Sequence, residues 1–393
     1  MGQTIVVGGG IIGLWTALKR KQSGREVTII DTYGVGNTLG SSSDRNRVIR
    51  SFYGGDDVYA SMVAKSFADW EWLESISRES IFNNTKALWM IEDGNSPDYA
   101  KNSIPVSKKY GMNCYAISNE EANKLYPQIN FQGVSNLYIE EKAGYINASS
   151  AAKELYKIFL SSGGSYLEGK VTNFNTTGNK ISSVETSCKN RINCDELVLS
   201  CGPWLNDITQ QILGYQVTSV TRQEVLYFSH PETGNHYTNK HLPVWINFGD
   251  KIHYGIPGSK STGFKIADDS RGALFSPSDE DRQLSQATIE SCRSLLKSRF
   301  PALKNAPLLW GKVCQYSNSV AGNYIIDLLP GHSNAIVVGA GNGHAFKNSP
   351  AIASEAIRLL DGETNPNEKF KINQINPKEK PGDQVTWARS KSV

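Results

Sequence analysis

The chain has 393 residues, of which 39% are hydrophobic and 20% are charged, with a formal net charge of +3. This length predicts about two domains with ordinary apolar cores, and the scattered Lys and Arg residues argue against a nucleic-acid partner. No apolar run reaches the roughly 18 residues of a membrane span, and the six cysteines favour neither a zinc site nor a disulfide framework.

No charged leader or cleavage-type segment precedes the first apolar run at Thr4–Val7. Because the cysteine usage also fits a reducing compartment, we expect a cytoplasmic protein with no membrane partner.

Residues 4–31 follow the pattern of strand, glycine-rich turn, helix and strand. The β-forming run Thr4–Val7 is followed at once by G-x-G-x-x-G, with its glycines at Gly8, Gly10 and Gly13. Gly8 permits a tight turn, Gly10 lets a pyrophosphate approach the backbone, and Gly13 lets the helix lie close to the strand. The amino end of that helix attracts the phosphate charge.

The second strand of this unit ends in a carboxylate. Asp31 lies 18 residues after Gly13, where an acid accepts hydrogen bonds from ribose hydroxyls. We therefore predict a dinucleotide site, against the alternative of a glycine-rich turn in an α/β unit that binds nothing. An acid at this position disfavours NADP but does not distinguish NAD from FAD.

A second glycine-containing segment lies near the other end of the chain. Residues 335–360 again have the pattern of strand, loop and helix, so we expect the two ends to meet on one cofactor. Between them, residues 165–174 and 194–204 have the pattern of strands of the same domain. The second ends in a turn at Gly202 that brings backbone close to the cofactor.

Two intervening blocks alternate aromatic and polar residues, which indicates an antiparallel sheet covered on one face. We therefore predict an α/β (α+β) fold with a Rossmann-like FAD-binding domain and a second, mostly antiparallel-sheet substrate domain. The predicted division gives 1–82, 145–215 and 310–370 to the first domain, 83–144 and 216–309 to the second, and 371–393 to a polar tail that wraps the surface or is disordered.

Six motifs then occur in order along nearly the whole chain. After the glycine-rich turn come R-x-I-R-x-x-Y-G at 47–54, YGIPG from Tyr254, GFK ending at Lys265, K-x-C-x-Y at 312–316, and GNGHAFK ending at Lys347. In this arrangement the chain resembles the flavoprotein amine oxidases of the D-amino-acid oxidase superfamily, in the branch of monomeric sarcosine oxidase and N-methyltryptophan oxidase. The resemblance implies FAD as the cofactor and a monomeric protein.

The resemblance also implies the cofactor contacts. They are Gly8, Gly10, Gly13, Asp31, Ser42, Ser43, Val171, Gly202, Cys314, Gly343, His344 and Lys347. Cys314 matches the cysteine that carries the flavin through a thioether to the 8α carbon of its ring. For Cys314 a small apolar core residue and a redox-sensing thiol are the alternatives, and for His344 a solvated loop histidine.

Four basic residues match functional positions of the family, and three of them, Lys265, Arg47 and Lys347, match catalytic ones. Lys347 matches a lysine that binds the substrate carboxylate, and Arg50 matches its partner, against the alternative of a solvated charge run. Arg47 resembles an arginine near the flavin face. Lys265 resembles the lysine that, with water, activates dioxygen, although a lysine in such a context is usually on the surface.

Tyr254 and Tyr316 would line the substrate cavity, where sheet packing is the alternative. Two positions depart from the family: Asp269 stands where sarcosine oxidases carry a histidine, and Trp245 where a smaller side chain is usual. Asp269 would attract a cationic group, act as a base or point to solvent, and Trp245 would stack on a substrate or fill a different core. Both departures argue against sarcosine as the substrate.

The three histidines His230, His236 and His241 do not have the spacing of a one-turn helical pair, so we expect no metal site. The leading hypothesis is an FAD-dependent oxidase that converts a secondary or cyclic amino acid, or a related small amine, to an imine by hydride transfer. O2 then reoxidises the flavin and yields hydrogen peroxide. A dehydrogenase that uses another electron acceptor and a non-catalytic flavin redox sensor are the alternatives.

Overall fold

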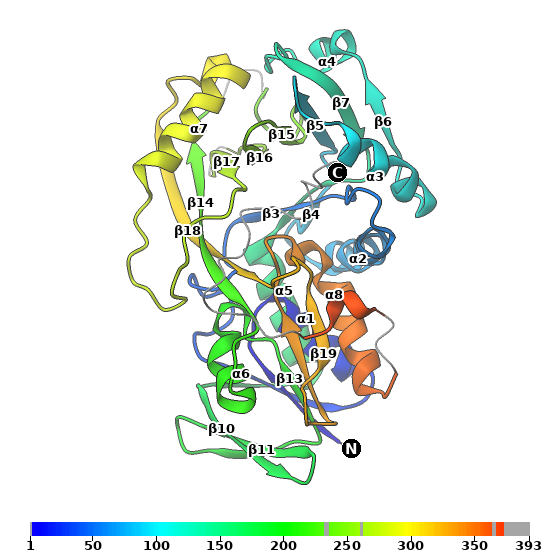
Figure 1. The fold of residues 1–393 in the computed structure, drawn as a ribbon, viewed down its shortest axis with the longest axis vertical. Helices are drawn as coiled ribbons and strands as arrows, with labels where there is room; N and C mark the ends of the chain where they lie inside the picture. Colours follow the sequence, from blue (N-terminus) through cyan, green and yellow to red (C-terminus); the bar gives the residue numbers. More distant parts are fainter. Residues whose placement is uncertain (1, 232–235, 260–261, 364–366, 373–393) are drawn as a thin grey trace.

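The computed structural model describes residues 2–231, 236–259, 262–363 and 367–372. Figure 1 shows two sheet systems along the long axis of the molecule, with a largely parallel sheet and its helices in the lower half and a larger mixed sheet above. The long antiparallel strands β14 and β18 extend between the upper part and the lower one.

The parallel sheet has the strand order β19-β20-β13-β1-β2-β9. Its strands are β1 (Gln3–Val7), β2 (Glu26–Asp31), β9 (Ser165–Glu168), β13 (Glu196–Leu199), β19 (Ile325–Leu328) and β20 (Ala335–Gly339). All neighbours run parallel except β19 and β20, which pair antiparallel. The first and last predicted glycine-containing segments therefore lie in one sheet, with only β13 between β1 and β20.

Both faces of this sheet are buried, which explains why its strands are almost continuously apolar. Val6 and Val198 point to a core shared with the helices, whereas Ile5 and Leu197 point to a second core on the opposite face. The helices of the first core are α1 (Ile11–Gln22), α2 (Asp57–Ile76), α5 (Ala148–Ser161) and α8 (Ala345–Leu360).

The described part of the chain also contains two three-stranded sheets and several short helices. They are β10 (Val171–Thr177), β11 (Lys180–Thr186) and β12 (Arg191–Asn193); β3 (Asn46–Ile49), β8 (Gly144–Asn147) and β4 (Phe82–Asn83); and α6 (Leu205–Leu213) with η1 (Gly202–Trp204) and η4 (Glu368–Phe370). The segment 165–174, predicted as one strand, is divided between β9 and β10, which belong to different sheets.

The larger sheet has the order β18-β14-β17-β16-β15-β5-β7-β6. Its strands are β5 (Ala87–Glu92), β6 (Cys114–Ile117), β7 (Val134–Glu140), β14 (Ser219–Phe228), β15 (Val244–Phe248), β16 (Ile252–Ile256), β17 (Phe264–Asp268) and β18 (Leu308–Asn318). Only β5 and β15 pair in parallel. The accompanying helices are α3 (Asp98–Lys109), α4 (Asn119–Leu125), α7 (Gln286–Arg299) and η3 (Pro301–Leu303).

The two faces of this sheet have different surroundings. Leu226, Phe228 and Ile266 pack on one face with Leu296 of α7. The opposite face carries Tyr227, Ala267 and Cys314, and it borders the cavity described below. Alternation along each strand therefore decides which side chains can reach a ligand.

Strand β18 is the place where the sheets depart from the predicted domain division. The prediction gives residues 310–370 to the FAD-binding domain, yet β18 pairs with β14 over almost its whole length in the larger sheet. The domain boundaries stay a prediction. The predicted combination of a Rossmann-like parallel sheet with a second, mostly antiparallel sheet is confirmed.

Most of the predicted tail, residues 373–393, lies outside the described residues. Among the helices of the described part of the chain, none is long and apolar enough to cross a membrane.

Candidate functional site

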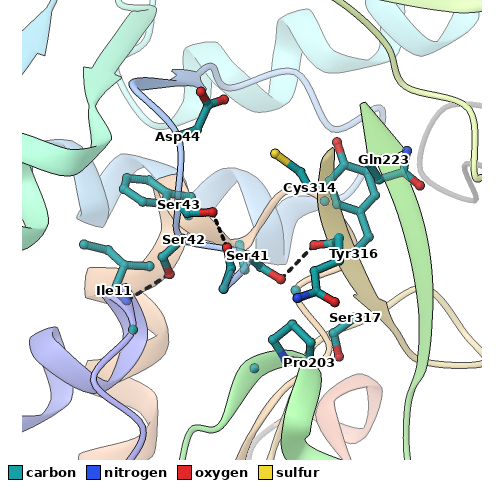
Figure 2. A pocket seen from close by; sticks show the side chains of 18 of the residues that line it. Ile11, Ser41, Ser42, Ser43, Asp44, Pro203, Gln223, Cys314, Tyr316 and Ser317 are labelled. Carbon is teal, nitrogen blue, oxygen red and sulfur yellow. Dashed lines mark hydrogen bonds between the residues drawn. The ribbon is translucent and has the colours of Figure 1, made fainter. Parts of the chain in front are cut away.

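A cavity of about 760 Å³ lies between the carboxyl ends of β1 and β2 and one face of the larger sheet. Most of the predicted site residues line it: Gly8, Gly10, Asp31, Ser42, Ser43, Arg47, Arg50, Val171, Gly202, Tyr254, Asp269, Cys314, Tyr316, Gly343, His344 and Lys347. Gly13, Trp245 and Lys265 do not line it. Figure 2 shows the segment with Ser41, Ser42, Ser43 and Asp44 facing Cys314 and Tyr316 of β18.

The glycines at the start of the cavity have no room for a side chain. A Cβ on Gly8, where φ is +108°, would lie 2.4 Å from the carbonyl oxygen of Ser200. A Cβ on Gly13 would lie 1.9 Å from the carbonyl oxygen of Gly8. Gly13 therefore acts as the sequence predicts, by letting α1 pack against the turn after β1, without bordering the cavity itself.

Asp31 closes β2 with both carboxylate oxygens held by backbone donors. Gly9 N donates to Oδ2 at 2.6 Å and Tyr33 N donates to Oδ1 at 2.9 Å. Nearby, the first amide of α1, Ile11 N, donates to Ser42 Oγ at 3.0 Å, a bond drawn in Figure 2. The glycine cradle, the helix terminus and the carboxylate have the chemistry that a dinucleotide needs.

A second helix terminus faces the same cavity. The loop after β20 leads into the first turn of α8. Residues 341–347 of this segment line the cavity, except Asn342. His344 is buried, and its Nδ1 lies 2.6 Å from the Tyr324 hydroxyl. Burial and the charge of Lys347 lower the pKa of His344 well below its ordinary value, so its imidazole is neutral. The alternative of a solvated loop histidine is therefore wrong.

Asp44 organises a buried charge cluster. It accepts hydrogen bonds from Lys265 Nζ at 2.6 Å, from the Tyr227 hydroxyl at 2.6 Å and from the Arg47 guanidinium. Lys265 also donates to the carbonyl oxygen of Asn46 at 2.9 Å. Although burial opposes it, the charge of Lys265 lowers the pKa of Asp44, which therefore stays ionised.

This cluster excludes the surface alternative for Lys265, whereas its role in oxygen activation stays a prediction. Its side chain is completely buried, so it is not a surface lysine. It lies on the cavity face of β17, like Ala267, but the Asp44 loop covers it and keeps it out of the cavity lining. Arg47 does line the cavity, and it also donates to the carbonyl oxygens of Ser41 and Ser43.

Arg50 and Lys347 bring two cations to the other end of the cavity. The Arg50 guanidinium lies 5.2 Å from the Trp89 ring centroid and 5.1 Å from that of Tyr53, and it donates to the carbonyl oxygen of Phe52. Lys347 Nζ donates to the carbonyl oxygen of His344 at 3.1 Å. Burial and the nearby Arg50 lower the pKa of Lys347 well below its ordinary value.

Asp269 and two tyrosines line the same end. The Tyr316 hydroxyl donates to Asp269 Oδ1 at 2.9 Å, and the Tyr316 ring borders Gly343, where a Cβ would lie 2.5 Å from it. Burial raises the pKa of Asp269 above its ordinary value. Burial and Asp269 together raise the pKa of Tyr254, so both tyrosines are neutral hydroxyls.

Cys314 is buried in β18 with its side chain on the cavity face. Burial raises the pKa of its thiol, whereas the charges of Arg47, Lys265 and Lys312 act to lower it. Cys201 also lines the cavity. The other four cysteines do not: Cys114, Cys194 and Cys292 are buried and Cys188 is exposed.

Trp245 is the site prediction that the structure overturns. It is completely buried on the opposite face of the sheet, with its ring centroid 5.9 Å from that of Phe264 and 4.9 Å from that of Phe300. Its neighbour Ile246 lines the cavity instead, because successive side chains of β15 point to opposite faces. The alternative of a core residue is therefore the right one.

Sequence reasoning missed the groups that hold the basic residues in place. Asp44 pairs with Lys265 across 221 residues of sequence, and Glu140 accepts hydrogen bonds from Ser51 N and from Trp89 Nε1, both beside Arg50. Neither carboxylate stands in a local motif that would identify it. Among the described residues, no group of three His, Cys, Asp or Glu side chains is placed to bind a metal ion.

The glycine cradle, the Asp31 carboxylate and the second helix terminus define a dinucleotide-binding protein whose cavity has a charged far end. The chain belongs to the family of FAD-dependent oxidoreductases (DAO), whose model matches residues 3–359. The prediction of this family and of FAD is therefore confirmed, and the backbone cradle described above fits that dinucleotide.

Individual relatives are more distant. The chain is 24% identical over 365 residues to the monomeric sarcosine oxidase of Bacillus sp. (strain B-0618), with 92% of each chain covered. It is 23% identical over 372 residues to the N-methyl-L-tryptophan oxidase of Salmonella dublin, covering 92% of this chain and 95% of the relative. The crystal structure of L-proline dehydrogenase from P. horikoshii is similar, with a TM-score of 0.81, 21% identity and coverage of 94% and 96%.

Proposed function

We propose that this protein oxidises the C–N bond of a secondary or cyclic amino acid to an imine. The observation that carries this proposal is the far end of the cavity, where Arg50, Lys347 and Asp269 line one space continuous with the dinucleotide cradle. Two cations and one carboxylate match the carboxylate and ammonium groups of an amino acid. The names of three similar proteins, which specify sarcosine, N-methyl-L-tryptophan and L-proline, support a secondary amine.

The two cations fix the substrate's carboxylate. A planar guanidinium and an ammonium group bind a carboxylate through charge-assisted hydrogen bonds, which orient it as well as attract it. Because the Arg50 guanidinium contacts the Trp89 and Tyr53 rings and donates to the carbonyl oxygen of Phe52, it is restrained before substrate arrives. This orientation places the carbon beside the nitrogen toward the cofactor.

The chemistry supplied by bound FAD is acceptance of two electrons from that carbon. The chain's own contribution would be electrostatic: the backbone amides at the start of α8 and the Arg47 guanidinium line the cavity and would stabilise negative charge on the bound cofactor. The amine must be neutral to release a hydride, so we expect kcat to rise with pH as the bound substrate loses its proton.

We further propose that FAD is attached covalently through the Cys314 sulfur. The support is its position: a buried thiol on the cavity face of β18, with Arg47 and Lys312 among the charges that act on it. Acid-denatured wild-type protein should retain flavin in the pellet, whereas Cys314→Ala protein should release it. Cys201→Ala is the control, because Cys201 borders the same cavity and should not affect retention. A colourless pellet from wild-type protein would refute the attachment.

For the electron acceptor we propose O2, with hydrogen peroxide as the product. A dehydrogenase is the second candidate, favoured by the Asp44–Lys265 ion pair, which offsets the positive charge that oxygen activation needs. The two candidates differ in reoxidation of the reduced protein. Faster reoxidation by air-saturated buffer than by a quinone supports the oxidase, and the reverse order supports the dehydrogenase. That the protein is a monomer stays a prediction.

An anaerobic screen tests the reaction itself. Secondary and cyclic amino acids are added to the oxidised holoprotein without oxygen, and the visible absorbance of flavin is followed. At least one should bleach it. If none does, the proposed oxidation is wrong and a non-catalytic flavin sensor becomes the better account.

A further inference from the structure

Asp269 lies directly after β17, at the charged end of the cavity. Its backbone is fixed by the bond from Asp269 N to the carbonyl oxygen of Ile252 at 2.8 Å, and its Oδ1 accepts the Tyr316 hydroxyl at 2.9 Å. Because the Tyr316 ring packs at Gly343 on the cavity wall, this bond holds the carboxylate toward the cavity rather than toward solvent. One Oδ1 bond leaves Oδ2 available to a ligand.

The cations at this end come from other elements. Arg50 directly follows β3, and Lys347 lies in the first turn of α8. Within the part of the chain that the structure describes, neither Asp269 nor Lys347 forms an ion pair. Opposite charges in one low-dielectric space attract strongly, so they stay apart only because the sheet and the helix hold them there.

Separated opposite charges that face one cavity are complementary to a ligand that carries both charges. We propose that Asp269 binds the ammonium group of the substrate, so that the cavity selects zwitterionic amino acids over carboxylic acids that lack the amine. This inference rests on the proposed function and gives the unassigned acid at position 269 a defined role. Arg50 and Lys347 take the carboxylate, and Asp269 fixes the nitrogen.

The neighbouring carboxylate provides a matched control. Asp268 Oδ2 accepts Lys251 Nζ at 3.0 Å, and its Oδ1 accepts Ser270 N at 2.8 Å. Asp268→Asn therefore removes a negative charge one residue away from Asp269. Unlike Asp269, the Asp268 side chain has both oxygens already bound. A competing account, in which Asp269 serves only to balance the nearby Arg271, predicts no discrimination between ligands.

The test uses two acids of the same shape that cannot be oxidised, because neither has hydrogen on the carbon beside the polar group or an N-methyl group. They are 2-aminoisobutyrate, a zwitterion, and 2-hydroxyisobutyrate, in which a neutral hydroxyl replaces the ammonium. Calorimetry measures the Kd of each for the oxidised holoprotein of the wild type, Asp269→Asn, Asp269→Glu and Asp268→Asn.

The wild type should bind the amino acid about tenfold or more tightly than the hydroxy acid, the effect expected of a charge-assisted hydrogen bond. Asp269→Asn should abolish this ratio, whereas Asp269→Glu and Asp268→Asn should retain most of it. Equal affinities in the wild type, or a ratio that survives Asp269→Asn, would overturn the inference and leave the proposed function intact. If neither acid binds the wild type, the carboxylate site fails, and the proposed function fails with it.

Discussion

The two ends of the cavity are built from different parts of the chain. At the dinucleotide end, the contacts come from backbone amides, glycines and one carboxylate within residues 8–42. At the substrate end, Arg50, Asp269 and Lys347 come from segments far apart in sequence. The buried Asp44–Lys265 pair beside the cavity also joins two distant segments. Local backbone geometry fixes the first end, whereas the second depends on how buried charges are distributed after the whole chain has folded.

Breaking the central ion pair should have the largest effect. Asp44→Asn leaves Lys265 buried without its carboxylate, so we expect the free energy of unfolding to fall by about 3–5 kcal/mol. The double variant Asp44→Asn/Lys265→Met should recover much of this loss, because it removes both charges. Denaturant unfolding of the wild type and the two variants measures these free energies. An unchanged midpoint in Asp44→Asn would contradict the stabilising role of Asp44 in the buried cluster.

The same ion pair has a pH signature. The pKa of Asp44 is lower in the folded protein than in the unfolded one, so its contribution is complete above the unfolded pKa. That contribution is lost as pH falls toward the folded pKa. The stability difference between the wild type and Asp44→Asn should therefore shrink below about pH 4.

A substitution at the dinucleotide end should have a smaller effect on stability but should weaken cofactor binding. Gly13→Ala places a Cβ 1.9 Å from the carbonyl oxygen of Gly8, so α1 must shift, at a cost of about 1–3 kcal/mol. FAD content after purification should fall. Gly55→Ala is the control, since a Cβ there meets no heavy atom within 4 Å. Normal FAD content in Gly13→Ala would contradict the close packing of α1.

The charged residues at the substrate end should determine the pH dependence of kcat/KM. Substrate binding requires ionised Asp269, whose pKa is raised, and protonated Lys347, whose pKa is lowered. The profile should therefore fall at acid pH through Asp269 and at alkaline pH through Lys347. The charged and titratable groups acting on Asp269 are Tyr316, Arg271, Arg50 and Asp268.

Asp269→Asn should change the acid limb of that profile, which then reports only the substrate amine, and leave the alkaline limb in place. Steady-state rates across the pH range measure both limbs. If the acid limb survives the substitution unchanged, a group other than Asp269 controls it.

The smallest effect should come from the two faces of β15. Trp245→Phe changes only the core against α7, so it should lower stability by under about 1.5 kcal/mol and leave KM unchanged. Ile246→Ala, on the cavity face, should change KM instead. Thermal unfolding and substrate kinetics distinguish the two, and a raised KM in Trp245→Phe would contradict the assignment of faces.

The sequence predicted the dinucleotide end well, because the residues that form it lie close together in the chain. Gly8 and Asp31 stand at fixed spacing in one strand–turn–helix–strand unit, and the motifs around Arg50, Cys314 and Lys347 identified most cavity residues. The face of Trp245 was missed because Ile246, its neighbour, is equally apolar, so alternation alone could not orient the strand. Asp44 was missed because its partner Lys265 is 221 residues away.

The central claim is that the charged end of the cavity delivers an amino acid to FAD for oxidation. Anaerobic titration of the wild type and Lys347→Met with one secondary amino acid, followed by the visible absorbance of flavin, tests it most directly. The account predicts complete bleaching of the wild type, and bleaching of Lys347→Met only at much higher concentration. Equal bleaching of both proteins, or persistent absorbance in the wild type with every secondary amino acid, would contradict it.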